Sequence, residues 1–308
     1  MSGRVLVIGS MNMDIVVGVE ELPKRGETLM ATRQVTYSAG GKGGNQAMAA
    51  GMAGADTAML ACVGSDDFGS ILRNKLESGN VDCSKIRVKD GIPTGQAFIS
   101  VDSHGNNCII VAAGANGEVS REYIEEQDAL IKESAIVLMQ MEIPFGTVLY
   151  AAKRAHELGK TVILNPAPAP DDLPDELLSC VDYLTPNETE LAKLAGTQGD
   201  PEDMAVIEEG ADRILSRGVK NLIVTLGAKG ILFASPEEKK VYPTVKVDAV
   251  DTTGAGDCFN GAFAAALAEG KGIPEAVRFA NAAASISVTR KGAQDAMPSR
   301  EEILKAGL

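Results

Sequence analysis

The sequence predicts an α/β fold built on a doubly wound, mostly parallel β-sheet with helices on both faces. Apolar segments of strand length alternate with amphipathic segments of helix length through most of the chain. Continuous apolar runs between amphipathic helices are typical of parallel strands that are buried on both faces. No linker, internal repeat or low-complexity tract interrupts the sequence, so we expect residues 1–308 to form a single domain.

The expected strands of this sheet are short apolar runs rich in Val, Ile and Leu. The first is VLVIGS, close to the N-terminus. The full set of expected strands covers residues 5–10, 57–64, 135–142, 161–168, 181–188 and 221–230.

Amphipathic segments between these runs predict the helices. Three of them cover residues 68–79, 145–159 and 201–218. A further helix is expected to follow Gly256 and to end at Gly270, where a glycine stops the alanine-rich segment. Its apolar face is formed by Phe259, Phe263 and Leu267.

Two β-rich stretches stand apart from this alternation. The first, within residues 12–40, contains DIVVGV (14–19) and a segment at 26–40 with the polar and apolar texture of surface strands. The second, residues 94–116, has two alternating runs that flank Asp102–Asn106, a typical hairpin turn. We therefore expect a small β-sheet attached to the main domain.

Composition and charge exclude several classes of function. The net charge of −13 argues against nucleic acid or an anionic membrane as a partner, and the absence of Trp argues against a stacking platform for single strands. Apolar runs are too short to span a membrane, and the N-terminus lacks a secretory signal, so we expect a cytoplasmic protein. An odd number of scattered cysteines indicates reduced thiols, and only two histidines are present, which argues against structural zinc.

Polar or glycine clusters follow four of the expected strands. Because ligands bind at the carboxyl ends of strands in open parallel sheets, these clusters should line one crevice. The alternative is that they are ordinary polar loops. The clusters are Gln140–Met141–Glu142, Asn165–Pro166, Asn187–Glu188 and Thr225–Leu226–Gly227.

The segment DTTGAGDCFNGAF (251–263) places glycines immediately before a predicted helix. A helix start offers unpaired N–H groups and a partial positive charge, and glycines allow an anion such as a phosphoryl group to approach them. A carboxylate at that place, Asp257, suits a base that deprotonates an attacking hydroxyl during in-line phosphoryl transfer. The alternatives are that Asp257 caps the helix and that the glycines form a tight turn.

Two better-known nucleotide motifs do not fit this chain. Phe259 occupies the sixth position of G-x-G-x-x-G, so a dinucleotide fingerprint and an oxidoreductase are disfavoured. The Gly-Lys-Thr at 159–161 has Arg154 where a Walker A loop needs its first glycine. Any nucleotide site is therefore not of the P-loop type.

A second glycine-rich segment, SAGGKGGNQAMAAG (38–51), also precedes an alanine-rich helix. It suits close backbone approach to a polyhydroxylated ligand, with Asn45 as both donor and acceptor. A flexible loop with a solvated Lys42 explains the same residues equally well.

Together the two glycine-rich segments, GGKGGN at 40–45 and DTTGAGD at 251–257, resemble the signature regions of the PfkB-type carbohydrate kinases, also called the ribokinase family. The second region is highly specific in this form. The resemblance covers essentially the whole chain and is strongest to the ribose-phosphorylating members. The further segments that carry it are GSMNMD (9–14), LMQME (138–142), LNPAPA (164–169), TPNETE (185–190), TLGAKG (225–230) and VTRKGAQ (288–294).

The resemblance implies an ATP-dependent kinase that phosphorylates the 5-hydroxyl of D-ribose. Asp257 would be the base, and the amides of Gly254, Ala255 and Gly256 would form an anion hole for the transferred group. The sugar-binding residues would be Asn12, Asp14, Gly41, Lys42, Gly43, Asn45, Glu142 and Asp257. The residues along ATP, with its Mg²⁺, would be Asn187, Glu190, Thr225, Gly227, Gly230, Gly256 and Asn281.

The resemblance also implies a monovalent cation such as K⁺ beside the anion hole. Its ligands would be Asp251, Thr253, Ser287, Arg290, Gly292 and Ala296, several through backbone oxygens. The β-rich stretches, about 12–40 and 94–116, would form a lid over the sugar, and the lids of two subunits would pair in a homodimer.

Other readings stay open. Family members of the same chemistry act on deoxyribose, fructose, 2-keto-3-deoxygluconate or a nucleoside. A catalytically silent sugar- or nucleotide-binding regulator is the alternative from another class, and the intact Asp257 argues against it.

Overall fold

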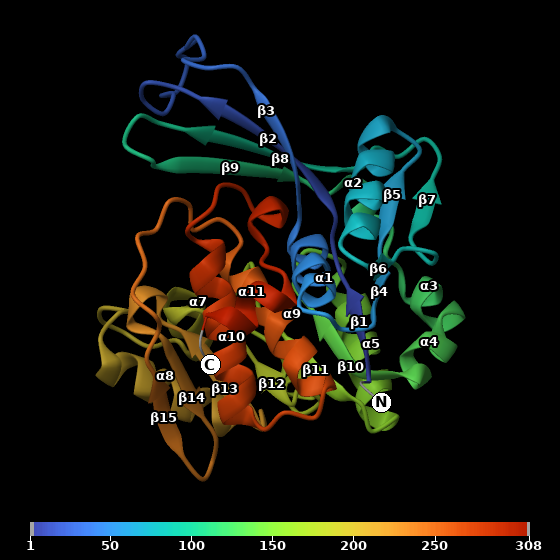
Figure 1. Cartoon of the computed structure of the whole chain (residues 1–308), viewed down its shortest axis with the longest axis vertical. Helices are drawn as coiled ribbons and strands as arrows, with labels where there is room; N and C mark the ends of the chain where they lie inside the picture. The colour runs from blue at the N-terminus through green and yellow to red at the C-terminus, as the bar shows by residue number, and fades with distance from the viewer. Residues whose placement is uncertain (1–2, 307–308) are drawn as a thin grey trace.

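The computed structural model describes residues 3–306 and has two main β-layers (Figure 1). The larger is a nine-stranded sheet in the order β15-β14-β13-β12-β11-β10-β1-β4-β6. It is parallel except for the antiparallel pairs that β14 makes with β13 and β15, so the predicted fold class is confirmed. Its strands are β1 (Arg4–Ile8), β4 (Thr57–Leu60), β6 (Val81–Asp82), β10 (Ser134–Met139), β11 (Thr161–Leu164), β12 (Tyr183–Leu184), β13 (Asn221–Thr225), β14 (Ile231–Ala234) and β15 (Lys239–Tyr242).

Helices cover both faces of this sheet, as the apolar strands require. Alternate residues of β1 face opposite layers: Val5 and Val7 pack in one apolar core, and Leu6 and Ile8 in the other. The first core takes residues from α1 (Lys42–Met52), α2 (Asp67–Ser78), α9 (Ala255–Ala268), α10 (Ile273–Ser287) and α11 (Arg300–Lys305). The second takes residues from α3 (Arg121–Glu126), α4 (Asp128–Glu133), α5 (Phe145–Glu157), α6 (Asp175–Leu178), α7 (Glu188–Ala195) and α8 (Met204–Leu215).

The observed strands end earlier than the predicted ones at their carboxyl ends. The run 57–64 divides into β4 and the separate β5 (Cys62–Gly64), which pairs with β7 (Arg87–Lys89) in a two-stranded sheet. The run 181–188 holds only β12, because the Asn187 side chain caps α7 instead of continuing the strand. Asn187 therefore lies at the border between sheet and loop: it caps α7 and forms an isolated parallel bridge with Thr225.

The small sheet has the order β3-β2-β8-β9, formed by β3 (Thr36–Gly40), β2 (Asn12–Gly18), β8 (Gly95–Val101) and β9 (Asn107–Ala112). Figure 1 shows it projecting from the main body, above α1 in the view. The predicted hairpin joins β8 to β9, and Asp102 Oδ1 accepts hydrogen bonds from the N–H groups of His104 and Asn106. The expected surface strand at 26–40 is confined to β3, because residues 26–35 are irregular.

Three short 3₁₀ segments complete the described chain: η1 (Gly114–Glu118), η2 (Gly227–Lys229) and η3 (Gln294–Ala296). No helix within residues 3–306 has the length and apolar character to cross a bilayer.

Candidate active site

The start of α9 forms one side of the site. Gly254 is the N-cap residue, with a left-handed backbone at φ 73°, and a Cβ there would lie 3.1 Å from Ala293 Cβ. A tight turn therefore exists, as the alternative reading supposed, and it feeds the helix. The N–H groups of the first turn have no carbonyl partner earlier in the helix. A Cβ on Gly256 would meet no atom within 4 Å, so open space lies in front of this turn.

Asp257 lies in the first turn of α9 and is only 6% exposed. Its Oδ2 accepts a hydrogen bond from Asn45 Nδ2 at 2.9 Å, and its Oδ1 accepts one from Gln46 Nε2 at 2.9 Å. Both donors come from α1, and the N-cap position of α9 belongs to Gly254. The capping alternative for Asp257 is therefore wrong.

A cavity of about 180 Å³ opens in front of this helix start. Asn165, Asn187 and Thr225, which follow or end three neighbouring strands, line it together with the turn before Asp257. Three of the four predicted clusters therefore contribute to one crevice at the strand ends, whereas Gln140–Met141–Glu142 lies outside its lining. Its full lining is Lys42, Asn165, Ala167, Thr185, Asn187, Glu190, Thr225, Thr252, Gly254, Ala255, Gly256, Asp257 and Asn260.

A larger surface cavity of about 610 Å³ lies elsewhere, beside α3 and α5. It holds none of the predicted site residues, and its charged side chains pair with one another, as Arg154 does with Asp128. We therefore place the functional site at α9.

The second glycine-rich segment is ordered as the start of α1. Gly41 has φ 82°, and a Cβ there would lie 2.7 Å from the Asn12 backbone N. A Cβ on Gly43 would lie 2.5 Å from Ser10 N. These glycines let the helix start close against the loop between β1 and β2, so the flexible-loop alternative is wrong.

Glu142 anchors this helix start to the end of β10. Its Oε2 accepts hydrogen bonds from Ser10 Oγ at 2.5 Å and from the Lys42 N–H at 3.0 Å. The Lys42 side chain lines the cavity. Burial opposes its charge, but the carboxylates of Asp257, Glu142, Glu190 and Asp14 together outweigh burial and raise the pKa of Lys42.

Asn12 and Asp14 lie on β2, facing the same region. Asn12 is 2% exposed, and its Oδ1 accepts a hydrogen bond from Asn116 Nδ2 at 2.7 Å. Burial raises the pKa of Asp14 to about 7, with Glu142 and Asp257 adding repulsion. Three carboxylates therefore converge near Lys42, an arrangement suited to ligand hydroxyl groups.

Asn187 and Glu190 form a capping box at the start of α7. Asn187 Oδ1 accepts from the Glu190 N–H at 2.8 Å, and Glu190 Oε2 accepts from the Asn187 N–H at 2.9 Å. Both side chains line the cavity with Thr225, and burial raises the pKa of Glu190. This pair therefore faces the start of α9 across the cavity.

Three residues predicted along ATP lie outside the cavity lining. Gly227 begins η2 and Gly230 follows it, with φ values of 52° and 105°. Asn281 lies in α10, where its Nδ2 donates to the Pro243 carbonyl at 3.0 Å. The structure thus separates these three from the lining residues.

Asp251, Thr253 and Gly292, predicted around the monovalent cation, are brought together. Asp251 Oδ1 accepts from Thr253 N and Oγ1 at 2.9 and 2.6 Å, and Oδ2 accepts from Gly292 N at 2.9 Å. Burial opposes the charge of Asp251, but these hydrogen bonds outweigh it and lower the pKa.

The other predicted cation ligands have partners of their own. Ser287 Oγ donates to the Ala284 carbonyl, the Arg290 side chain pairs with Glu302, and the Ala296 N–H donates to the Ala293 carbonyl. Residues 3–306 hold no group of three or more His, Cys, Asp or Glu side chains arranged for a metal. The Asp251 carboxylate and the Thr253 hydroxyl are oxygen groups of the kind that a hard cation prefers.

Sequence reasoning missed several polar residues of the site, chiefly Gln46, Asn116 and Asn260. Gln46 follows Asn45 within the second glycine-rich segment. The sequence therefore indicated that it lies near the site, but not that it contacts Asp257. Asn260 Nδ2 donates to the Gly256 carbonyl at 2.9 Å, one helical turn away. Nothing in the local sequence marks Asn116, which reaches Asn12 across 104 residues.

The model of the pfkB family carbohydrate kinases matches residues 2–300. The chain belongs to this family. A ribokinase of Haemophilus influenzae is 43% identical over 97% of this chain and 96% of its own. The crystal structure of a ribokinase from Thermotoga maritima has a TM-score of 0.89 at 43% identity, with 99% of both chains covered. The structure of Arabidopsis thaliana ribokinase complexed with ribose and ATP has a TM-score of 0.91 at 37% identity, again with 99% of both chains covered.

Proposed function

We propose that this pfkB-family protein transfers the γ-phosphoryl group of ATP to the 5-hydroxyl of D-ribose, giving D-ribose 5-phosphate and ADP. The observation that carries the proposal is the nearly buried carboxylate of Asp257 beside the open first turn of α9. The ribokinases of H. influenzae and A. thaliana, similar over nearly the whole chain, support ribose and ATP as the substrates.

In this mechanism Asp257 takes the proton of the sugar hydroxyl as its oxygen attacks the γ-phosphorus. A new O–P bond forms on the sugar, and the bond from the γ-phosphorus to the bridging oxygen of ADP breaks. The N–H groups of Gly254, Ala255 and Gly256 stabilise the charge of the transferred group, because the helix start aims unpaired donors and its dipole at it.

The sugar would bind between β2 and the start of α1. Its hydroxyls would pair with Asn12, Asp14, Asn45 and Glu142, and the backbone of Gly41, Lys42 and Gly43 would approach the ring closely. A buried polar group left without a partner costs about 1–3 kcal/mol, so a site of this kind rejects a sugar that lacks one hydroxyl.

The nucleotide would lie along the strand ends toward α7. Asn187, Glu190 and Thr225 line the cavity on that side, and Gly227, Gly230 and Asn281 would extend the site beyond it. The carboxylate of Glu190 suits Mg²⁺ held largely through water, which when bound offsets the negative charge of the phosphates.

A monovalent cation such as K⁺ would bind at the Asp251 loop. Two hydrogen bonds from Thr253 order the loop before α9, and the bond from Gly292 N to Asp251 Oδ2 joins this loop to the segment that follows α10. A bound cation would add positive charge beside the helix start. Turnover measured with and without K⁺ tests this role, and equal rates would remove it.

The small sheet would act as a lid over the sugar and as the contact between two subunits. Several of its apolar side chains are exposed, including Phe98 at 45% and Ile110 at 66%. Pairing with the same sheet of a second subunit would bury them and protect the edge strands. Closure over the sugar would exclude water, which favours transfer over ATP hydrolysis.

The substitution Asp257→Asn tests the proposed chemistry. We expect ribose and ATP to bind and turnover to fall by a factor on the order of 10³ or more, because the base is lost. Asp203→Asn is the matched control: Asp203 caps α8 and Asn caps equally well. A rate close to that of the wild type in Asp257→Asn would overturn the base assignment.

A panel of sugars assayed by ADP release tests the substrate. D-Ribose should give the highest kcat/KM among ribose, 2-deoxyribose, fructose, 2-keto-3-deoxygluconate and nucleosides. Equal or better turnover of another compound would replace ribose as the substrate while leaving the phosphoryl-transfer chemistry in place.

A further inference from the structure

Gln46 contacts Asp257, the proposed base, from the interior of the protein. It belongs to α1, it is fully buried at 0% exposure, and each of its polar side-chain atoms has a partner inside the protein. Nε2 donates to Asp257 Oδ1 at 2.9 Å and to Asn165 Oδ1 at 3.1 Å. Oε1 accepts from Gln140 Nε2 at 2.7 Å. No atom of this side chain is therefore left to contact a ligand.

A backbone carbonyl sets the orientation of these amides. The Thr185 carbonyl can only accept, so Asn165 must turn its Nδ2 toward it, at 2.8 Å. Asn165 then presents Oδ1 to Gln46, and Gln46 must answer with Nε2. The Oε1 of Gln46 consequently faces Gln140, which supplies Nε2. Each side chain thus fixes the next, and the result is a donor held against Asp257 Oδ1.

The same network reaches the helix that carries Asp257. Thr185 Oγ1 donates to Asn260 Oδ1 at 2.6 Å, and Asn260 Nδ2 donates to the Gly256 carbonyl at 2.9 Å. The side chains involved are 0–7% exposed. The strand ends and the first turn of α9 are therefore joined by neutral groups, and Asp257 is the only charged member.

We propose that Gln46 is a positioning residue for the phosphoryl-transfer step: it holds Asp257 Oδ1 toward the protein interior and so presents Oδ2 to the sugar hydroxyl. Asp257 Oδ2 accepts a hydrogen bond from Asn45. Asn45 is one of the residues proposed to bind the sugar, so Oδ2 would face the sugar. A carboxylate held at one oxygen has one productive rotamer, and small displacements of a reacting group cost large factors in rate. The inference rests on the proposed role of Asp257.

Gln46→Met tests it, since the side chain keeps its volume and loses its donor. We expect kcat to fall about 10–100-fold, a factor typical of a misplaced catalytic group, while the KM values for ribose and ATP stay within about twofold. Gln140→Met is the matched control. Gln140 is equally buried and belongs to the same network, but it contacts neither Asp257 nor the cavity. The kcat of Gln140→Met should stay within about threefold of the wild-type value, because Asn165 and Asp257 still orient Gln46.

A double mutant separates positioning from general loosening of the core. If Gln46 acts through Asp257, adding Gln46→Met to Asp257→Asn should change the residual kcat less than twofold. Multiplied effects would overturn the inference, as would an unchanged kcat in Gln46→Met or an equal loss in Gln140→Met. If Asp257→Asn alone leaves turnover intact, the proposed function fails. If Asp257→Asn is inactive and Gln46→Met is fully active, the inference about Gln46 alone fails.

Discussion

The side chain of Asn116 holds Asn12 by a hydrogen bond of 2.7 Å from its Nδ2 to Asn12 Oδ1. Asn116 also accepts from the Met11 N–H at 2.8 Å, so both ends of its amide are fixed by the segment that carries Asn12. Asn12 Oδ1 already accepts one hydrogen bond, so we expect the NH₂ group to be the part of this side chain that binds a ligand. In the proposed sugar site it would donate to a sugar oxygen.

Asn116→Leu should weaken sugar binding without touching the sugar. Asn12 then loses the bond that orients its amide, and we expect the KM for ribose to rise about tenfold, the effect of one lost hydrogen bond of about 1–1.5 kcal/mol. The KM for ATP should not change. Steady-state kinetics with each substrate varied in turn measures this.

Asn221→Leu is the control for Asn116→Leu. Asn221 Nδ2 donates to the Asp182 carbonyl at 2.9 Å at the start of β13, at the opposite end of the strand from the site. An equal rise in ribose KM in both variants would contradict a specific link between Asn116 and the sugar.

Gly256→Ala should separate stability from activity. Gly256 is helical and a Cβ there meets no atom within 4 Å, so packing does not require glycine. Alanine in a helix gains about 0.5–1 kcal/mol over glycine, so the melting temperature should rise. The new methyl group stands in the proposed path of the phosphoryl group, and kcat/KM for ATP should fall at least tenfold.

Gly146→Ala provides the comparison, because Gly146 lies in α5 with the same open surroundings and far from α9. It should gain stability and keep full activity. A Gly256→Ala variant with unchanged kinetics would show that nothing approaches the helix start closely.

The raised pKa of Asp14 predicts that kcat/KM for ribose decreases at acidic pH. Burial shifts it from 3.8 to about 7, so Asp14 is largely protonated below neutral pH. A carboxylate accepts from sugar hydroxyls better than a carboxylic acid does, so kcat/KM for ribose should increase as pH rises through about 7. In Asp14→Asn this decrease should move or vanish, and an unchanged pH profile would assign it to another group.

The same shift predicts how stability depends on pH. The folded state binds the Asp14 proton more tightly than the unfolded state, so ionisation costs stability as pH rises from about 4 to about 7. Asp14→Asn removes this cost. Its melting temperature relative to the wild type should therefore be higher at pH 8 than at pH 4, and a constant difference would contradict the assignment.

The sequence was sufficient for the fold class and for the two glycine-rich helix starts, because these depend on local patterns. Apolar runs placed six of the nine strands of the main sheet, and β6, β14 and β15 were not predicted. The glycines before Asp257 marked a helix that starts at Ala255. The ends of strands were harder: the run 57–64 looks continuous, yet its last residues pair with β7 instead of staying in the large sheet. Pairing of that kind is decided by partners distant in sequence.

The buried polar contacts of Asp257 could not be predicted from local sequence patterns, because they too join residues that are distant in sequence. Gln46 and Asp257 are 211 residues apart, and only the packing of α1 on α9 brings them together. A glutamine in a helix is usually exposed to solvent, so the sequence alone would predict no special role for Gln46.

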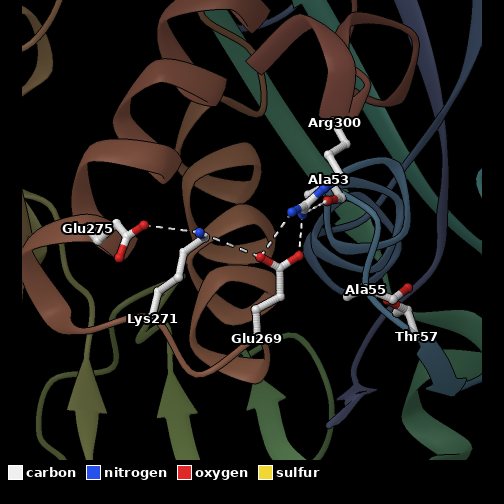
Figure 2. A network of polar contacts seen from close by, with 7 residues as sticks. All are labelled: Ala53, Ala55, Thr57, Glu269, Lys271, Glu275 and Arg300. Carbon is white, nitrogen blue, oxygen red and sulfur yellow. Dashed lines mark hydrogen bonds and ion pairs between the residues drawn. The ribbon is translucent and has the colours of Figure 1, made fainter. Parts of the chain in front are cut away.

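An ion-pair network at the end of α9 should stabilise the fold independently of activity (Figure 2). Arg300 donates to both carboxylate oxygens of Glu269 and, at 3.1 Å, to the carbonyl of Ala53, the C-cap residue of α1. Lys271 joins Glu269 to Glu275 (Figure 2). Arg300 thus ties α11 to the ends of two helices whose opposite ends form the site.

Arg300→Met should lower the free energy of unfolding by about 1–2 kcal/mol, since a bidentate pair and a helix cap are lost from a partly exposed position. The matched control on the same helix is Lys305→Met, which loses an exposed i,i+4 pair with Glu301 and should cost no more than about 0.5 kcal/mol. Urea unfolding measures both. The kcat of Arg300→Met at 25 °C should stay within about twofold, and a large loss of turnover in the folded variant would mean that α11 positions the site and does more than stabilise it.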